Sequence, residues 1–336
     1  MRYLLLAAVL LAGCSSPAHV AGTVVEIEAP LGLPPVPIPP DNPPTQESIA
    51  LGKKLFFDAI LSADDTVSCA SCHDPKLAFT DGMPTAKGIK AQFGKRNTPT
   101  VLNAAYYPLL FLDGRAPSLE EQAGGPIANP LEMGQTHDVT VSKIAKIPQY
   151  KIAFEKVFGP GAVTIQKISM ALASYERTVL SGDSPFDRYL YKNDQSAMNA
   201  AAIRGLKIFT DKKRGNCSTC HTIGETYSLF SDGKFHNIGA GMNANGEMTD
   251  LGRYEQTHID ADKGAFRTPG LRNVGLTAPY MHDGSVKTLK DVVDFYAGGG
   301  TSNPQLDPEI HELKLSGQDR ADLVAFLESL TGKPKT

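Results

Sequence analysis

The chain has 336 residues, with 33 basic and 36 acidic side chains, five cysteines and no tryptophan. This length predicts two domains, each with room for a hydrophobic core. The formal net charge of -3 excludes the large basic field that nucleic-acid binding needs, and 41% hydrophobic against 21% charged residues excludes wholesale disorder.

Residues 1–13 have the pattern of an export signal. Arg2 precedes a run of leucine, alanine and valine that is too short to span a bilayer as a helix. The boundary from Leu11 to Cys14 resembles a bacterial lipobox, whose cysteine is lipidated. We therefore predict an exported protein, lipid-anchored through Cys14 to a bacterial membrane and facing the periplasm or the cell surface. The alternative is an ordinary signal peptide in which Cys14 has no role.

Residues 14–44 are rich in proline, with proline pairs at 34–35, 39–40 and 43–44. Such a segment favours extended conformations and has too little patterned hydrophobicity to fold alone, so we predict a stalk. The folded body is expected to start near Thr45, with an N-terminal domain over 45–182 and a C-terminal domain over 183–336.

Apolar residues recur at helical spacing in four places, and no segment shows convincing strand alternation. The last helix has a predicted N-cap at Ser316 and an end near Gly332. The stripes are Ile49, Gly52, Leu55 and Phe56; Ile165, Ile168, Leu172, Tyr175 and Val179; Met198, Ala201, Gly205 and Phe209; and Leu323, Phe326, Leu327 and Leu330. We interpret each as core packing in a mainly α protein.

The four remaining cysteines lie in two identical C-x-x-C-H motifs. They are Cys69, Cys72 and His73, and Cys217, Cys220 and His221. This pattern attaches c-type haem: the thiols add to the vinyl groups, and the histidine supplies the proximal iron ligand. A four-thiolate zinc site needs pairs about 15–20 residues apart, whereas nearly half the chain separates these. Disulfide-forming pairs would not explain why histidine follows both.

The two haem motifs lie within a longer repeat. Arg96-Asn97-Thr98-Pro99 corresponds to Arg267-Thr268-Pro269, and Leu112-Asp113-Gly114 corresponds to His282-Asp283-Gly284. A shared period of this length predicts duplicated domains rather than a solenoid. We expect two cytochrome c-like helical domains, related by a pseudo-twofold axis, each holding one covalent haem.

From about Thr45 to Gly332, the chain resembles the bacterial di-haem cytochrome c peroxidase superfamily, in particular its MauG-like branch. The motifs that carry the resemblance are Leu61-Ser62, both haem motifs, 96–100, 113–115, 119–123, 125–127, 129–133, 235–239, 267–269 and 282–284. The resemblance implies an N-terminal haem that reacts with hydrogen peroxide and a C-terminal haem that exchanges electrons with a protein partner.

The resemblance also implies roles for residues around the haems. Gln122, Pro126 and Glu132 match the distal pocket of the peroxide haem, with Glu132 as the acid/base group that moves the proton during peroxide cleavage. Outside this motif, a glutamate after Asn-Pro-Leu would be a solvated loop residue. A second set, Asn97, Thr277 and Pro279, matches oxygen ligands of a calcium ion between the haems.

Three positions depart from the classical peroxidase pattern. Where those enzymes have a histidine that blocks the peroxide haem, this chain has Lys90, so we expect an open distal face; the alternative is a deprotonated Lys90 ligand. The usual methionine ligand of the electron-transfer haem is replaced by Tyr296, as in MauG-like enzymes; Met281 is the competing ligand, and simple packing is the third possibility. Leu112 replaces the inter-haem tryptophan of the family.

These features leave three functional hypotheses. A MauG-like enzyme would use peroxide to oxidise a partner protein, which Lys90 and Tyr296 favour. A classical cytochrome c peroxidase would reduce peroxide to water with electrons from a small cytochrome or cupredoxin. A di-haem electron carrier would lack peroxide chemistry, which Glu132 and Gln122 argue against.

Overall fold

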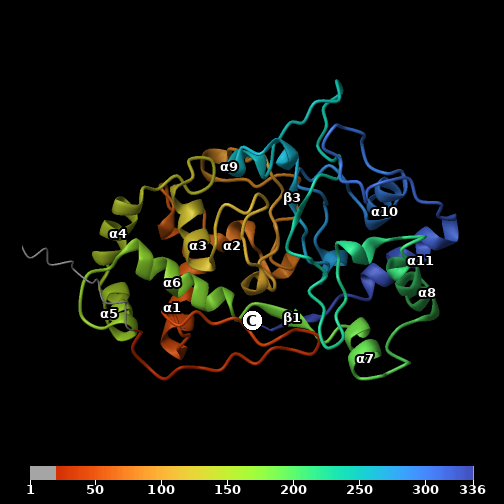
Figure 1. The fold of residues 1–336 in the computed structure, drawn as a ribbon. Helices are drawn as coiled ribbons and strands as arrows, with labels where there is room; N and C mark the ends of the chain where they lie inside the picture. Colours follow the sequence, from red (N-terminus) through yellow and green to blue (C-terminus); the bar gives the residue numbers. More distant parts are fainter. Residues whose placement is uncertain (1–19, 336) are drawn as a thin grey trace, which may run out of the picture.

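The computed structural model describes residues 20–335. The expected export segment 1–13 and the expected lipidation site Cys14 lie outside them. The described chain forms two helical halves side by side, with the N-terminal half around α1 to α6 and the C-terminal half around α7, α8, α10 and α11, while α9 lies over the N-terminal half (Figure 1). None of the helices in this part of the chain is long and apolar enough to cross a membrane.

The regular elements are mainly helices, and the strands are only two or three residues long. The longer helices are α1 (Gln46–Phe57), α3 (Leu119–Ala128), α4 (His137–Ala145), α5 (Pro148–Phe158), α6 (Ile165–Glu176), α7 (Pro185–Tyr191), α8 (Ala200–Thr210), α10 (Leu289–Ala297) and α11 (Gly317–Glu328). The short elements are α2 (Cys69–Cys72), α9 (Tyr254–Thr257), β1 (Leu180–Gly182), β2 (Phe235–His236), β3 (Phe266–Arg267) and β4 (Lys333–Lys335). The mainly α class predicted from the apolar stripes is confirmed.

In the N-terminal half, α1 and α6 cross in direct backbone contact. A Cβ placed on Gly52 of α1 would lie 1.8 Å from the carbonyl oxygen of Ala171 in α6. Beside this crossing, the rings of Phe56 and Tyr175 pack edge to face at 5.2 Å. Glycine is therefore required at this point of α1, because any larger residue would push the two helices apart.

The C-terminal half repeats this arrangement with α8 and α11. A Cβ on Gly205 would lie 2.0 Å from the carbonyl oxygen of Asp322, and Phe209 packs on Phe326 at 4.9 Å. Ser316 caps α11 in a reciprocal capping box with Asp319, as the sequence predicted. The same helix pairing thus occurs in both halves.

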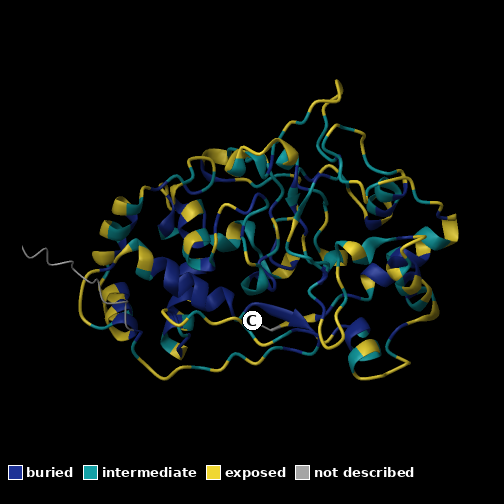
Figure 2. Ribbon diagram, in the orientation of Figure 1, coloured by how far each residue is buried: buried dark blue, intermediate teal, exposed yellow. Residues whose placement is uncertain are grey.

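The buried apolar side chains form one large core in each half. The first draws on residues between Val20 and Val179, and the second on residues between Phe186 and Leu330. The predicted boundary at residue 182 lies between them. At this junction α6 and β1 are buried over most of their length, and β1 pairs with β4 at the end of the described chain (Figure 2).

Residues 20–44, which we call the N-terminal arm, pack on both halves of the body. The carbonyl oxygen of Pro34 accepts a hydrogen bond from the Tyr106 hydroxyl at 2.8 Å, and that of Gly32 accepts one from the Ser228 amide at 3.0 Å. Extended proline-rich backbone makes no internal hydrogen bonds, so its carbonyls are free to accept from other groups. The predicted free-standing stalk is therefore wrong for this part of the segment.

A buried ion pair holds the arm to the C-terminal half. Arg272 pairs with Asp187 at 2.7 Å, and their side chains are 3% and 0% exposed. The same guanidinium donates to the carbonyl oxygen of Gly32 in the arm. Asp187 also caps α7 through Ser184. Because each group of this cluster is committed to a partner, removing one would leave a buried charge uncompensated.

We expect substitution of Gly205 by alanine to lower the free energy of unfolding by about 1–3 kcal/mol, because the added methyl group overpacks the α8–α11 crossing. The matched control is Gly317→Ala at the start of α11, where an added Cβ meets no atom within 4 Å. This control should change stability by about 0.5 kcal/mol or less, in the stabilising direction. Denaturant unfolding of the haem-loaded protein measures both, and equal effects would contradict the close-contact explanation.

Candidate haem sites

The first C-x-x-C-H motif forms the short helix α2, and its histidine is fixed by a backbone carbonyl. The Nδ1 atom of His73 lies 3.1 Å from the carbonyl oxygen of Phe79. Nδ1 is then the protonated nitrogen, which leaves Nε2 free as an acceptor. Burial lowers the pKa of His73, so the ring is neutral, the form that binds iron. The ring of Phe56 from α1 lies 6.4 Å away.

The second motif has the same geometry. The Nδ1 atom of His221 lies 2.9 Å from the carbonyl oxygen of Phe230, and the ring of Phe209 from α8 lies 6.5 Å away. Burial lowers the pKa of His221 and raises that of the Cys217 thiol. Neutral thiols in apolar surroundings suit thioether attachment, because a thioether carries no charge into the protein interior.

Each motif opens into a cavity. The N-terminal cavity, with a volume of about 480 Å³, contains His73 and Cys72; the C-terminal cavity, of about 300 Å³, contains His221, Cys217 and Cys220. Both volumes lie in the range of cofactor sites. All four cysteines of the described chain are free, and the two pairs do not meet in a four-thiolate group there. The residues present therefore fit two covalent haems better than zinc or a disulfide.

The three predicted distal-pocket residues lie together in the N-terminal cavity. Gln122 and Pro126 reach it from α3, and Glu132 reaches it from the loop that follows. The amide of Asn129 donates a hydrogen bond to Glu132 at 2.6 Å. Burial raises the pKa of Glu132, while Arg115 and Asn129 oppose that rise. The carboxyl is thus held in place in a setting that eases its protonation.

The loop that carries Lys90 is held against the segment of Glu132. The Ile89 amide donates to the backbone carbonyl of Glu132 at 2.8 Å, and the Ile89 side chain is buried. Lys90 itself has a left-handed backbone with φ 54° and an exposed side chain. It does not line the N-terminal cavity, where His73 is the one histidine among the described residues.

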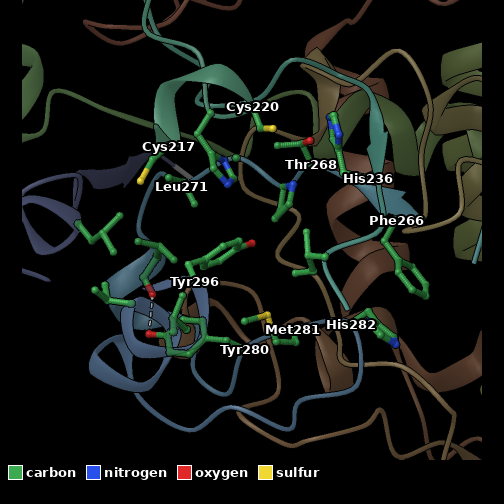
Figure 3. Close-up of a pocket in the computed structure, with 18 of the residues that line it drawn as sticks. Cys217, Cys220, His236, Phe266, Thr268, Leu271, Tyr280, Met281, His282 and Tyr296 are labelled. Atoms are coloured by element: carbon green, nitrogen blue, oxygen red, sulfur yellow. Dashed lines mark hydrogen bonds between the residues drawn. The ribbon is translucent and has the colours of Figure 1, made fainter. Parts of the chain in front are cut away.

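Tyr296 and Met281 both line the C-terminal cavity. Tyr296 extends from α10 toward the side of the cavity where Cys217 and Cys220 lie, and Met281 lies beside it (Figure 3). Burial and the two cysteine sulfurs raise the pKa of the Tyr296 phenol. A phenolate at this position therefore needs a compensating cation, which ferric iron would supply.

His236 lies in the same cavity between two carboxylates. Its Nδ1 lies 2.6 Å from Asp307, and its Nε2 lies 3.0 Å from Asp232. A hydrogen bond with Cys220 and these two carboxylates raise the pKa of His236 to about 10. The atoms of Cys220, Asp232 and His236 lie close enough to hold a metal ion. We assign this cluster to the haem surroundings, because Cys220 belongs to the attachment motif.

One wall separates the two cavities, and we call it the shared wall. Its members line both cavities: Asn97, Thr98, Pro99, Thr100, Tyr107, Leu112 and Arg267. The guanidinium of Arg267 lies 3.6 Å above the ring of Tyr107, whose hydroxyl accepts a hydrogen bond from the Gly270 amide at 2.7 Å. The predicted calcium residues Thr277 and Pro279 line the C-terminal cavity together with Asn97.

Two residues of these cavities were missed from the sequence. Arg267 was noted only as part of a repeated motif, and Glu176 was hidden in the apolar stripe of α6. Glu176 lines the N-terminal cavity although it is only 5% exposed. A usable signal was the pair Glu176-Arg177, two charged residues at the end of an otherwise buried stripe.

Comparison with known proteins agrees with this geometry. A family model described as di-haem cytochrome c peroxidase matches residues 46–195. The methylamine utilization protein MauG of Methylorubrum extorquens is 41% identical, over 89% of this chain and 82% of its own length. The cytochrome c551 peroxidase of Pseudomonas aeruginosa is 40% identical, over 87% and 81% respectively.

A solved structure shares the whole architecture. The crystal structure of a MauG-like protein associated with microbial copper homeostasis matches with a TM-score of 0.80 at 33% identity, over 91% of this chain and 95% of that one. Close relatives thus carry both names, MauG and cytochrome c peroxidase. The chain belongs to the di-haem cytochrome c peroxidase family, which includes the MauG proteins.

Proposed function

We propose that this haem-dependent peroxidase uses hydrogen peroxide to oxidise a partner protein, as MauG-like enzymes do. The observation that carries the proposal is the N-terminal cavity, which is lined by Glu132 and Gln122 together with His73 and not by Lys90. With no second histidine lining this cavity, a bound haem keeps one face open to peroxide before any reduction. Bound haem would supply the redox chemistry: it would donate electrons to peroxide and accept electrons from the partner protein.

Glu132 has the position and the environment for the proton transfer. Cleavage of peroxide requires a group that takes a proton from one oxygen and returns it to the other, and a half-buried carboxyl of raised pKa does both. The Asn129 amide donates a hydrogen bond to one carboxylate oxygen of Glu132 at 2.6 Å, which leaves the other oxygen available for proton transfer. Gln122 offers an amide to orient peroxide in the same cavity.

Tyr296 supports the same proposal from the C-terminal cavity. A phenolate ligand is a hard anion that stabilises oxidised iron, whereas the thioether of Met281 favours the reduced state. We propose Tyr296 as the second ligand of this haem, alongside His221. We also propose two haems per chain, calcium at Asn97, Thr277 and Pro279, and lipid anchoring through Cys14.

The second candidate is a classical cytochrome c peroxidase. Leu112 in the shared wall counts against the first proposal, because a saturated side chain cannot carry an oxidising equivalent between the haems. Tyr107 does not replace the missing relay, since the cation of Arg267 over its ring makes that ring harder to oxidise. The electron must therefore cross this wall by tunnelling.

We expect two covalent haems per chain, as measured by intact mass and by the absorption of the pyridine haemochrome. Replacing both Cys217 and Cys220 by serine should reduce the count to one, because the N-terminal motif is independent. Replacing Cys14 by serine serves as the cysteine control and should leave two. A count of one in the unaltered protein would contradict the assignment of both motifs.

We expect one equivalent of hydrogen peroxide to change the haem absorption of the fully oxidised protein within seconds, because the N-terminal cavity is open. Stopped-flow spectroscopy without reductant measures this. A reaction that starts only after one-electron reduction would instead establish the classical peroxidase. No reaction in either state would leave an electron carrier.

We expect Glu132→Gln to slow that reaction about 10²–10⁴-fold, because glutamine can neither take nor return the proton. Glu121→Gln is the control, since Glu121 is exposed on the same helix as Gln122. Both variants should retain the haem absorption of the unaltered protein. A rate for Glu132→Gln within a few-fold of the control would remove Glu132 from the mechanism.

A further inference from the structure

Besides Glu132, a second carboxyl without a salt bridge lines the N-terminal cavity. Glu176 is the last residue of α6, is 5% exposed, and lines the cavity together with His73 and Gln122. Its Oε2 atom is buried and has no hydrogen-bond partner. An unsatisfied carboxylate oxygen at such a place is costly, so the atom indicates a group that meets something in the cavity.

Arg177, which follows Glu176 in the chain, directs its two terminal nitrogens to another carboxylate, and its buried Nε has no hydrogen-bond partner. Arg177 makes two hydrogen bonds to the carboxylate of Glu120 in α3, at 2.7 and 3.1 Å. The side chain of Asn42 in the N-terminal arm also donates to Glu120, at 2.7 Å. These contacts neutralise Glu120 and leave Glu176 without a salt bridge.

The surroundings therefore favour the neutral acid. Burial raises the pKa of Glu176 to about 8, with Arg177 lowering it and Glu120 raising it. Tyr175 precedes Glu176 on α6. Burial and the charge of Glu176 raise the pKa of the Tyr175 phenol to about 12, so this phenol stays neutral. Burial and the charge of Glu176 raise the pKa of the Cys69 thiol in α2, but this thiol ceases to titrate once it is bound to haem.

We propose that Glu176 is a protonated acid in the resting enzyme and supplies a proton to the N-terminal cavity during peroxide reduction. This role rests on the proposed function. Reduction of hydrogen peroxide to two waters consumes two protons and two electrons. Glu132 moves a proton from one oxygen to the other and so provides no net proton.

Glu132 delivers the proton that lets the departing oxygen leave as water. In the proposed step, the O–H bond of the Glu176 carboxyl then breaks and an O–H bond forms on the remaining oxygen, as two electrons reduce it to the second water. Water beside the haem passes the proton on, since polar side chains such as Gln122 and Asn129 line this cavity. The electrons come from the haem irons and then from the partner protein. The carboxylate left behind regains its proton from solvent. Glu176 thus acts through water and does not touch peroxide itself, which distinguishes its role from that of Glu132.

Infrared titration of the oxidised, haem-loaded protein tests this without peroxide. In a Glu132→Gln background, Glu176 is the one carboxyl of the described chain whose pKa is raised. We expect a carboxylic-acid carbonyl band at pH 7 that disappears as the pH rises through about 8. Adding Glu176→Gln should abolish it, and adding Glu155→Gln, at an exposed site on α5, should not. No band at pH 7, or a band that survives Glu176→Gln, would overturn the proposal.

The pH profile of steady-state peroxide reduction, with a one-electron reductant in excess, is the second measurement. In the unaltered protein the rate should fall as the pH rises above about 8, because Glu176 then lacks its proton. Glu176→Gln should react about 10²-fold more slowly at pH 7 and should lose this dependence. An unchanged profile would overturn proton supply by Glu176. A protein that shows the infrared band but no reaction with peroxide would instead overturn the proposed function alone.

Discussion

Direct backbone contact between two helices in each half is the constraint on which the rest of the molecule depends. Where α1 crosses α6 and α8 crosses α11, a glycine removes the side chain that would hold the helices apart. The turn that follows each glycine then places a phenylalanine between the partner helix and the proximal histidine. Phe56 contacts Tyr175 and His73, and Phe209 contacts Phe326 and His221. The same phenylalanine in each half therefore packs the two helices together and contacts the histidine proposed to bind the haem iron.

Local signals in the sequence were sufficient for four of the longer helices and for the haem motifs. Periodicity and capping predicted α1, α6, α8 and α11, because burial of one face and satisfaction of the first amides are properties of neighbouring residues. The placement of Glu132, Gln122 and Pro126 in one cavity came from the family motifs and not from periodicity. The packing of the N-terminal arm was not predictable, because it depends on donors such as Arg272, 240 residues further along the chain.

The two cavities differ in what their walls allow. The N-terminal cavity has one histidine and two carboxyls that form no salt bridge, Glu132 and Glu176, an arrangement suited to moving protons. Its other carboxyls pair with Arg96. The C-terminal cavity has a phenol and a thioether within reach of one iron position, an arrangement suited to setting a potential. Between them, Leu112 and the cation-covered ring of Tyr107 form a wall without an easily oxidised group. Under the proposed function, proton transfer to peroxide would take place in the N-terminal cavity and electron exchange with the partner protein at the C-terminal one.

The N-terminal arm has a consequence for the order of assembly. Synthesis proceeds from the N-terminus, so the arm is made before Ser228 and Arg272, the groups that bind the carbonyl of Gly32. The strand that pairs with β1 at the junction, β4, is among the last residues made. The first and last segments of the described chain thus meet at the same junction, and that junction forms only after β4 has been made. A chain that ends before Arg272 therefore lacks a donor that binds the N-terminal arm.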